Sequence, residues 1–456
     1  MKTPICDFVN SYAKKDTARL HMPGHKGVSF LGCEKMDITE IRGADELYDA
    51  EGIIAESERN AESLFGFGKT IYGTEGSSQC IRTMLFLALQ GAEQTGERSV
   101  VLAARNAHKA FLYSCALMDL DVEWLMPEEG QKSSLCTCPI TAEQVEGKLS
   151  EMEQKPFAVY MTAPDYLGYS PDIRGIAEVC KQADIPLLVD NAHGAYLKFL
   201  RPSRHPMDLG ADLCCDSAHK TLPVLTSGAY LHLSAGMDAA VGTQARNALM
   251  IFGSTSPSYL ILQSLDAGNR YLEHYPRLLS DFVQKTAVLK EQLLARGYPL
   301  YGREPLKLTI EPKPFGYTGH QLADRLREEG MEPEFADRDH LVLMLTPELG
   351  MAALDQIGQV LCRIPARESI RESAPAFSPA RQILSIREAM LSPAEMLPVE
   401  QCIGRVLAVP TVGCPPAVPI LVCGEQIDEH AVACFRYYGI ESCCVVKTRQ
   451  EVSHGT

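Results

Sequence analysis

Short apolar runs alternate with helical stretches through the middle of the chain. Amphipathic stretches at 51–66, 79–91 and 172–184 predict helices. Near-continuous apolar strands separated by helices are typical of a mainly parallel sheet that is covered on both faces. In such sheets, ligands bind at the carboxyl ends of the strands, so we expect the functional residues there. The predicted strands lie at 99–104, 157–164, 185–190, 211–215 and 228–233.

The pattern changes after about residue 275, where a smaller α+β domain is predicted. A long amphipathic helix is expected at 277–297, followed by an apolar run at 305–312. A second helix is expected at 318–330, because Thr318 and Gln321 match a capping box at its start. An apolar run at 340–347 closes this unit.

The C-terminal part of the chain begins with a polar, proline-containing segment at 366–382, which is typical of a linker. Ser392, Pro393 and Glu395 then match a cap, a first-turn proline and a nearby carboxylate, and predict the start of a helix. The expected organisation is an N-terminal arm at 1–50, a large domain at 51–275, a small domain at 276–365 and a C-terminal α+β domain at 383–456.

The composition argues against several classes of protein. The chain has 456 residues, 46% hydrophobic and 22% charged, which is ordinary for a globular protein of roughly two to four domains. A net charge of −15 argues against nucleic acid or an anionic membrane as the main partner. No run reaches the ~18–20 apolar residues of a membrane span, and the N-terminus shows no signal peptide. The sixteen cysteines match no disulfide or zinc framework, so reduced thiols and a cytoplasmic location are expected.

Several polar residues follow the predicted strands closely enough to form one site. Asp190 ends an apolar run, where an unpaired carboxylate would be costly, and Lys220 follows the next run, although lysine usually lies on the surface. His108 follows an earlier run, and Thr74–Gln79 begins a helix with small residues whose N–H groups suit an anion. Together they suit pyridoxal 5′-phosphate (PLP), which needs a lysine for a Schiff base, an acid for its pyridine nitrogen and a phosphate site.

An ordered series of motifs lies between about residues 20 and 270: LHMPGHKG, MDITEIRGADELYDAEGII, TEGSSQ, ARNAHKA, LVDNAHGAYL, DSAHKTLPVLTSGAYLH and GSTSPSYLILQSLDAGN. This series resembles the Orn/Lys/Arg decarboxylase family. The resemblance implies an aspartate-aminotransferase-like α/β fold (PLP fold type I) with a mainly parallel seven-stranded sheet in the large domain. It fits the compact members, which lack an N-terminal receiver-like wing domain. The C-terminal PPAVPILVCGEQI also resembles that family's C-terminal domain.

The resemblance also implies roles for individual residues. Lys220 matches the Schiff-base lysine, Asp190 the partner of the pyridine nitrogen and His108 the histidine that stacks on the ring. Lys220 or His219 is expected to return a proton to the substrate. Further cofactor contacts are implied for Ala192 on the other ring face, for Ser217 and His219 near the phosphate, for Gly76 and Ser77 in the phosphate turn, and for Ser254 and Thr255, which in such dimers reach the phosphate of the neighbouring subunit.

The implied reaction is the α-decarboxylation of lysine, arginine or ornithine to carbon dioxide and a diamine or agmatine, a step of polyamine biosynthesis. The sequence does not select among the three substrates. A homodimer or larger assembly is expected, with active sites at the interface. Another PLP reaction, such as transamination or a lyase step, stays open because one fold hosts many chemistries. A third hypothesis is a relative without catalytic activity that acts as a binding partner. The presence of Lys220 and Asp190 argues against it.

Some residues depart from the family pattern or carry weaker signals. Asn191 stands where the family often has glutamate, and Glu75 lies close to where a phosphate is expected. His193 reads as a structural hydrogen-bonding residue at least as readily as a catalytic one. His21 and His25 are four residues apart, but the intervening Pro-Gly excludes a helical pair of ligands, so no metal site is expected.

Overall fold

The computed structural model describes residues 1–15, 17–92, 98–128, 134–237, 239–376, 378, 380–410 and 416–448. Parts of the predicted linker (377 and 379) and of the predicted C-terminal domain (411–415 and 449–456) lie outside the described residues. The chain divides into two compact units, Met1–Ala92 with Cys180–Asp281 and Glu93–Val179 with Phe282–Thr456. Within the described ranges, no helix has both the length and the apolar character that a membrane crossing needs.

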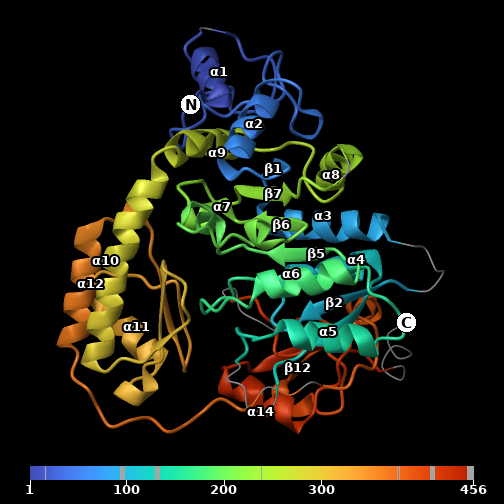
Figure 1. Ribbon diagram of the computed structural model, residues 1–456, viewed down its shortest axis with the longest axis vertical. Helices are drawn as coiled ribbons and strands as arrows, with labels where there is room; N and C mark the ends of the chain where they lie inside the picture. The colour runs from blue at the N-terminus through green and yellow to red at the C-terminus, as the bar shows by residue number, and fades with distance from the viewer. Residues whose placement is uncertain are drawn as a thin grey trace. The chain divides into compact units, whose positions relative to one another are not determined.

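The first unit contains four strands of the large sheet, in the order β1-β7-β6-β5 (Figure 1). β5 and β6 are parallel, and Asp190 on β5 is the register partner of Cys215 on β6. β7 runs antiparallel to both of its neighbours. Every residue of β5, β6 and β7 is buried, as their apolar sequences predict. The bounds are β1 (Lys69–Gly73), β5 (Leu187–Asp190), β6 (Leu213–Asp216) and β7 (Ala229–Leu233).

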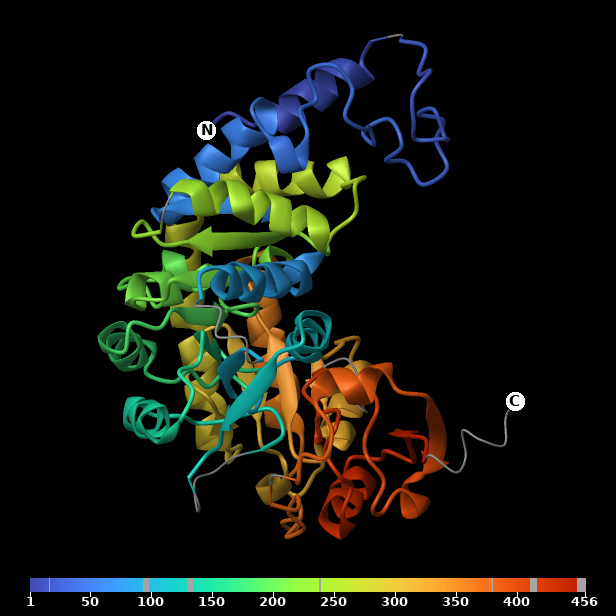
Figure 2. The same cartoon turned by 90° about the vertical axis from the view of Figure 1, so that its right-hand side faces the viewer.

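Helices of the first unit include one in the N-terminal segment that the sequence pattern did not predict. Helix α1 buries Ile5 and Val9, and the backbone N–H of Cys6 donates to Asp266 at 2.9 Å. The described part of 17–46 contains no helix or strand and forms the blue loop at the upper right of Figure 2. The elements are α1 (Pro4–Ala13), α2 (Ile53–Phe65), α3 (Gly76–Gln90), α7 (Ala218–Thr221), α8 (Ala239–Ile251) and α9 (Tyr259–Leu272), with 3₁₀ turns η1 (Leu47–Asp49), η2 (Ala195–Phe199) and η3 (Pro206–Leu209).

The second unit contributes three parallel strands in the order β4-β2-β3, which brings the large sheet to seven strands. Five of the seven strands were predicted, and the mainly parallel α/β fold is confirmed. The elements are β2 (Val100–Ala104), α4 (Lys109–Met118), β3 (Asp121–Leu125), α5 (Ala142–Glu151), β4 (Ala158–Thr162) and α6 (Ile173–Gln182).

The two strands that the pattern missed are β1 and β3, which stand at the two ends of the strand order. β3 has the sequence DVEWL and only its last residue is buried. β1 begins with Lys69, which is half-buried. β3 is partly exposed, whereas the other four residues of β1 are buried. The sequence of β1, KTIYG, still mixes lysine, threonine and glycine with two large apolar residues, so neither strand shows the continuous apolar run that marks an inner strand.

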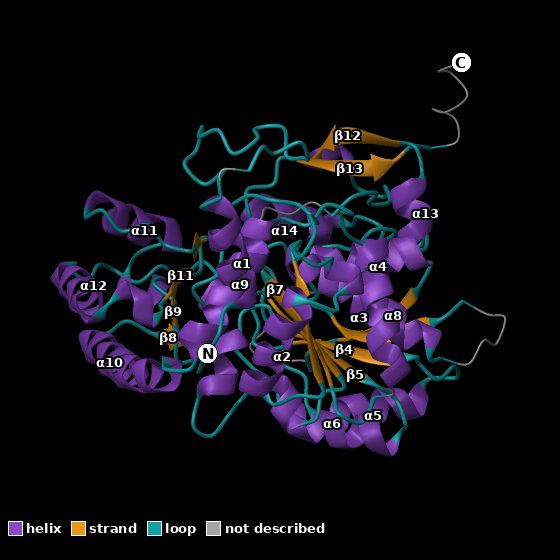
Figure 3. Ribbon diagram, turned by 90° about the horizontal axis from the view of Figure 1, so that it is seen from above, coloured by secondary structure: helices purple, strands orange, loops and turns teal. Residues whose placement is uncertain are grey.

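A four-stranded antiparallel sheet, in the order β10-β11-β9-β8, follows the long helix α10. Figure 3 shows helices α10, α11 and α12 along one face of this sheet. The predicted capping box of Thr318 and Gln321 is present at the start of α11. The elements are α10 (Tyr275–Arg296), β8 (Leu300–Tyr301), β9 (Lys307–Ile310), η4 (Lys313–Phe315), α11 (Gly319–Glu328), β10 (Phe335–Ala336), β11 (Leu341–Met344), η5 (Pro347–Leu349) and α12 (Met351–Arg363).

The C-terminal segment corrects one prediction. Residues from Ala394 onward form strand β12, which pairs antiparallel with β13, rather than the helix predicted from Ser392. The helix start lies earlier in the sequence, where Ser385 and Glu388 form a complete capping box. Pairing with a distant strand overrides a local capping signal in this segment. The elements are α13 (Ile386–Leu391), β12 (Ala394–Pro398), η6 (Val399–Gln401), α14 (Glu429–Tyr437) and β13 (Ser442–Val446).

Candidate active site

Asp190 lies at the carboxyl end of β5 and is 2% exposed. Its Oδ1 accepts a hydrogen bond from the backbone N–H of Ala192 at 3.1 Å, and the Cys215 thiol lies 3.6 Å from the same oxygen. A carboxylate is expensive to bury without compensating partners. These contacts hold the Asp190 carboxylate in one place at the end of the strand, with Ala192 in the turn that follows it.

Lys220 lies in the single-turn helix α7, which follows the neighbouring strand β6. Its Nζ is 3.2 Å from Nε2 of His193, which lies in the turn after β5. An ammonium group can only donate, so a charged Lys220 donates this hydrogen bond and Nε2 of His193 accepts it. The contact therefore joins the turns that follow β5 and β6, as expected for polar residues at the ends of adjacent parallel strands.

His219 precedes Lys220 and points its Nδ1 to the carbonyl oxygen of Gly228 at 3.0 Å. Burial lowers the pKa of His219 below its ordinary value; the hydrogen bond to Gly228 opposes this shift, and the charge of Lys220 adds to it. The ring is therefore neutral at physiological pH, with the Nδ1 proton donated to Gly228 and a lone pair on Nε2. Ser217, the N-cap residue of α7, is 1% exposed, and its side chain makes no capping hydrogen bond.

The start of helix α3 has the features of an anion site. Gly76 has φ +72°, and no atom lies within 4 Å of the position where a Cβ would stand. The first N–H groups of a helix have no intrahelical acceptor, and Ser77 lies among them. Thr74, just before the helix, is 4% exposed, and its Oγ1 has no hydrogen-bond partner among the described residues. A buried hydroxyl without a partner beside a helix N-terminus suits a phosphate oxygen.

Glu75 lies within the predicted phosphate turn but contacts the loop that carries Ser254. Its carboxylate accepts a short hydrogen bond from the backbone N–H of Ser254. The hydroxyl of Tyr48 donates to the carbonyl oxygen of Ser254 at 3.0 Å. A Cβ on Gly253 would lie 2.2 Å from Nε2 of Gln79, a distance that real Cβ atoms essentially never show. The loop that carries Ser254 is thus tied to the start of α3, and Ser254 and Thr255 are both exposed there.

His108 belongs to the second unit, where it precedes α4 as its N-cap residue. Its Nδ1 accepts a hydrogen bond from the backbone N–H of Ala110 at 3.1 Å. The first unit thus carries Asp190 and Lys220 with the other predicted cofactor residues, Ala192, Ser217, His219, Gly76, Ser77, Ser254 and Thr255, whereas His108 is carried by the second unit.

A buried group beneath these turns was missed by the sequence reading. His205, Asp216 and His232 are fully buried, and their ligand-type atoms lie within 4.8 Å of one another. However, Nδ1 of His205 accepts from the backbone N–H of Met207 at 3.2 Å, so its Nε2 carries the proton and donates to Asp216. A metal ion bound by His205 at this group would need the lone pair of Nε2, but the proton occupies that position. The group is therefore a carboxylate held by hydrogen bonds. The only sequence signal was an aspartate directly after an apolar strand.

The same carboxylate is strongly stabilised in its ionised form. Burial alone would raise the pKa of Asp216, but the attraction and hydrogen bonds of His205 and His232 hold it well below its usual range. The amide of Asn191 adds a third hydrogen bond at 2.6 Å. Asn191 directly follows Asp190, so Asp216 also anchors the turn that carries the predicted cofactor partner.

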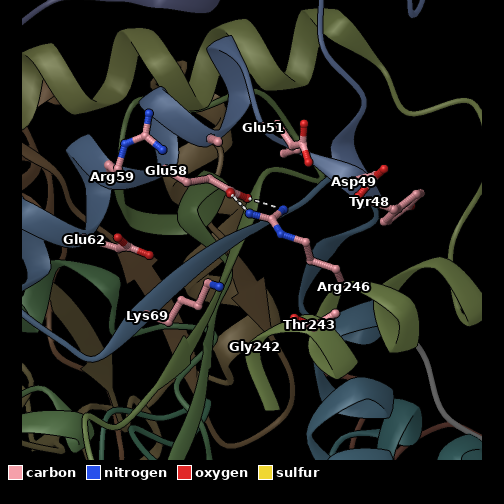
Figure 4. A pocket seen from close by; sticks show the side chains of 12 residues that line it. Tyr48, Asp49, Glu51, Glu58, Arg59, Glu62, Lys69, Gly242, Thr243 and Arg246 are labelled. Atoms are coloured by element: carbon pink, nitrogen blue, oxygen red, sulfur yellow. Dashed lines mark hydrogen bonds and ion pairs between the residues drawn. The ribbon is translucent and has the colours of Figure 1, made fainter. Parts of the chain in front are cut away.

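A cavity of about 440 Å³ lies elsewhere in the first unit, between α2, β1 and α8. Figure 4 shows Glu58 and Arg246 facing each other at its wall, where they form an ion pair, with Lys69 nearby. Burial raises the pKa of Glu58, and Arg246 opposes that rise. None of the predicted site residues lines this cavity, so it is separate from the strand-end site.

Similarity to known proteins agrees with this geometry. The chain matches the Orn/Lys/Arg decarboxylase major domain over residues 3–300 and the C-terminal domain of the same family over residues 371–443. It is 28% identical over 466 residues to an arginine decarboxylase of Halalkalibacterium halodurans, covering 95% of this chain and 93% of the relative. It is 27% identical over 461 residues to the uncharacterized protein YaaO of Bacillus subtilis, covering 95% and 93%.

Solved structures share the fold. The lysine decarboxylase LdcF of Francisella novicida superimposes with a TM-score of 0.79 at 15% identity, over 98% of this chain and 81% of that chain. The constitutive lysine decarboxylase of E. coli gives 0.78 at 18% identity, over 98% and 82%. Because the family's major domain spans well over half of the sequence, the chain belongs to the Orn/Lys/Arg decarboxylase family, and the prediction of an amino-acid decarboxylase is confirmed.

Proposed function

We propose that the protein catalyses the PLP-dependent α-decarboxylation of a basic amino acid. The observation that carries the proposal is the arrangement at the ends of β5 and β6. Buried Asp190 ends β5, and Lys220 follows β6, with its amine 3.2 Å from His193 of the Asp190 turn. The lysine and the buried acid thus lie at the ends of two adjacent strands, and they are the two kinds of group that a PLP ring needs.

The residues present fit that cofactor. Lys220 is the amine that would attach it covalently, and Asp190 is the carboxylate that would keep its pyridine nitrogen protonated. Three features would hold the phosphate: the Thr74 hydroxyl, which has no hydrogen-bond partner within the described ranges, the N-terminus of α3 and the buried Ser217 side chain. When bound, the cofactor supplies an electron sink that takes up the electron pair left when the Cα–carboxylate bond breaks.

Residues of the chain supply the proton that replaces carbon dioxide on Cα of the substrate. The His193 ring orients the Lys220 amine through Nε2. Burial keeps His219 neutral, and its only ring proton is donated to Gly228, so His219 is a poor acid at physiological pH. We therefore assign to Lys220 Nζ, rather than to His219, the proton that replaces carbon dioxide on Cα.

We propose arginine as the first substrate to assay, with lysine and ornithine beside it. The family description names all three amino acids, and relatives that match over 95% of this chain are named arginine decarboxylases. We also propose a homodimer in which Ser254 and Thr255 reach the partner's cofactor phosphate. Placement of the protein in the cytoplasm and in polyamine biosynthesis stays a prediction.

The test uses the purified full-length protein incubated with PLP. Carbon dioxide release is measured on L-arginine, L-lysine and L-ornithine, and amino-group transfer to a keto acid is measured in parallel. After borohydride reduction, peptide mass spectrometry locates the attached cofactor. The wild type should release carbon dioxide from one of the three substrates and carry the cofactor on Lys220. Amino-group transfer without carbon dioxide release would replace the proposal with transamination.

Lys220→Ala should abolish the cofactor adduct and reduce turnover by at least about 1,000-fold. The matched control is Lys181→Ala, which removes an exposed lysine in α6 and should leave both readouts unchanged. An adduct or near-normal turnover in the Lys220 variant would refute the assignment.

A further inference from the structure

Arg105, directly after β2, forms a buried ion pair with Glu425 in the C-terminal segment. One guanidinium nitrogen lies 3.2 Å from Glu425 Oε2, and the two side chains are 3% and 4% exposed. The guanidinium also donates to the carbonyl oxygens of Pro419 at 3.3 Å and Ile420 at 3.2 Å. Glu425 Oε2 in turn accepts from the backbone N–H of Val422 at 2.7 Å. These contacts fix the loop at 419–425 on Arg105, the residue that follows β2.

Such a pair determines geometry more than it adds stability. Removing two charges from water is costly, and their attraction offsets that cost only with good geometry and further hydrogen bonds. Arg105 meets those conditions through its carbonyl acceptors, and it also lies over the ring of Trp124, 5.2 Å from the centroid. The ion pair therefore holds this part of the chain in one arrangement.

The same C-terminal segment contacts both ends of helix α4. At its start, the backbone N–H of Lys109 donates to the carbonyl oxygen of Ala417 at 2.9 Å. At its end, Arg387 of α13 donates to the carbonyl oxygens of Ala116 at 2.8 Å and Leu117 at 3.1 Å. A helix end leaves carbonyl groups without intrahelical partners, and a cation there is favourable.

His108 lies between these contacts, three residues after Arg105 and directly before Lys109. Its ring is fixed to the helix start, because Nδ1 accepts from the backbone N–H of Ala110 at 3.1 Å. Turning the imidazole would break this hydrogen bond, so the orientation of the ring is coupled to the first turn of α4.

We infer that Glu425 is a positioning residue for His108, acting through Arg105 and the start of α4. In this arrangement the C-terminal domain sets where the imidazole lies, and thereby how well it can stack on a cofactor ring. The inference rests on the proposed function, because the stacking role of His108 is part of that proposal.

The test begins with Glu425→Gln, which keeps the shape of the side chain and an acceptor for Val422 while removing the charge. PLP affinity is measured by absorbance titration of four full-length proteins: the wild type, Glu425→Gln, His108→Ala and the double variant. Glu425→Gln should weaken binding about tenfold in the wild-type background. If Glu425 acts through His108, the same change should have almost no effect in the His108→Ala background, which is a non-additivity that general destabilisation does not produce.

Hydrogen exchange of the α4 amides, measured without added cofactor, gives an independent readout. Glu425→Gln should accelerate exchange in residues 109–118. The matched control is Glu400→Gln in the same domain, where the ion pair with Arg436 is 3.1 Å long and both side chains are 59% exposed. The control should match the wild type in exchange and affinity.

The two proposals fail separately. If the wild type binds no PLP, the proposed function fails, while the exchange data still decide whether Glu425 holds α4. Unchanged exchange in Glu425→Gln, or an equal loss of affinity with and without His108, would overturn the positioning role.

Discussion

Replacing Asp216 with asparagine removes the charge at the centre of the buried His205–Asp216–His232 group. The carboxylate accepts from Nε2 of His205 at 3.0 Å, from Nε2 of His232 at 3.1 Å and from the amide of Asn191 at 2.6 Å. Asparagine keeps one accepting oxygen but places an NH₂ group where the other oxygen stood. Because all three neighbours are donors in this arrangement, at least one loses its acceptor.

The size of the effect follows from these contacts. Hydrogen bonds to a charged group contribute about 1.5–3 kcal/mol each, and a buried donor without an acceptor costs about 1–3 kcal/mol. Loss of the charge also removes the cost of keeping a carboxylate in the interior, which offsets part of the damage. We therefore expect Asp216→Asn to lower the free energy of unfolding by about 3 kcal/mol, at the lower end of the range for breaking a buried charged pair.

The assay is urea unfolding of the full-length protein at neutral pH, followed by circular dichroism. Asp121→Asn is the matched control, because Asp121 is 46% exposed and its partner Arg98 lies 3.1 Å away at the surface. An exposed pair contributes up to about 1 kcal/mol, so the control should unfold close to the wild type. If Asp216→Asn also unfolds within about 0.5 kcal/mol of the wild type, the buried carboxylate is not held as described.

Two further predictions concern pH and assembly. Burial lowers the pKa of His232 and of His219, so the unfolded chain takes up protons that the folded chain does not, and stability should fall as the pH drops below about 6.5. The urea midpoint, measured from about pH 8 to pH 5.5, checks this, and a flat profile would contradict it. If Thr255 acts in the partner's site, mixing inactive Lys220→Ala and Thr255→Ala dimers should restore up to about one quarter of wild-type decarboxylation, since half of the dimers are mixed and each holds one intact site. Absence of recovery after verified subunit exchange would place Thr255 outside the partner's site.

The sequence predicted the inner part of the fold because burial leaves a continuous apolar signal. β5 and β6 are buried throughout and were recognised with their terminal polar residues. β1 and β3 were missed because outer strands mix polar and apolar residues. The helix predicted from Ser392 was wrong because β12 is specified by pairing with β13, almost fifty residues further along, which no local pattern encodes.

The candidate site, like the fold, could be predicted from the sequence only in part. Asp190 and Lys220 could be selected because a charged residue at a buried strand end is unusual, and the structure brings their turns together through His193. The hydrogen-bonded group around Asp216 could not be found in this way, since its histidines come from η3 and β7 and only the fold assembles them. The roles of the selected residues and the predicted domain boundaries stay predictions.

Trp124 has a consequence for any spectroscopic study of this protein. It is the single tryptophan of the chain and belongs to the second unit, beneath the Arg105 guanidinium. Tryptophan emission therefore reports on the surroundings of Trp124 in the second unit and does not report directly on the first unit, which carries Asp190 and Lys220. If the two units melt at different denaturant concentrations, the fluorescence and circular dichroism curves should separate, and their divergence would measure how independently each half of the molecule holds together.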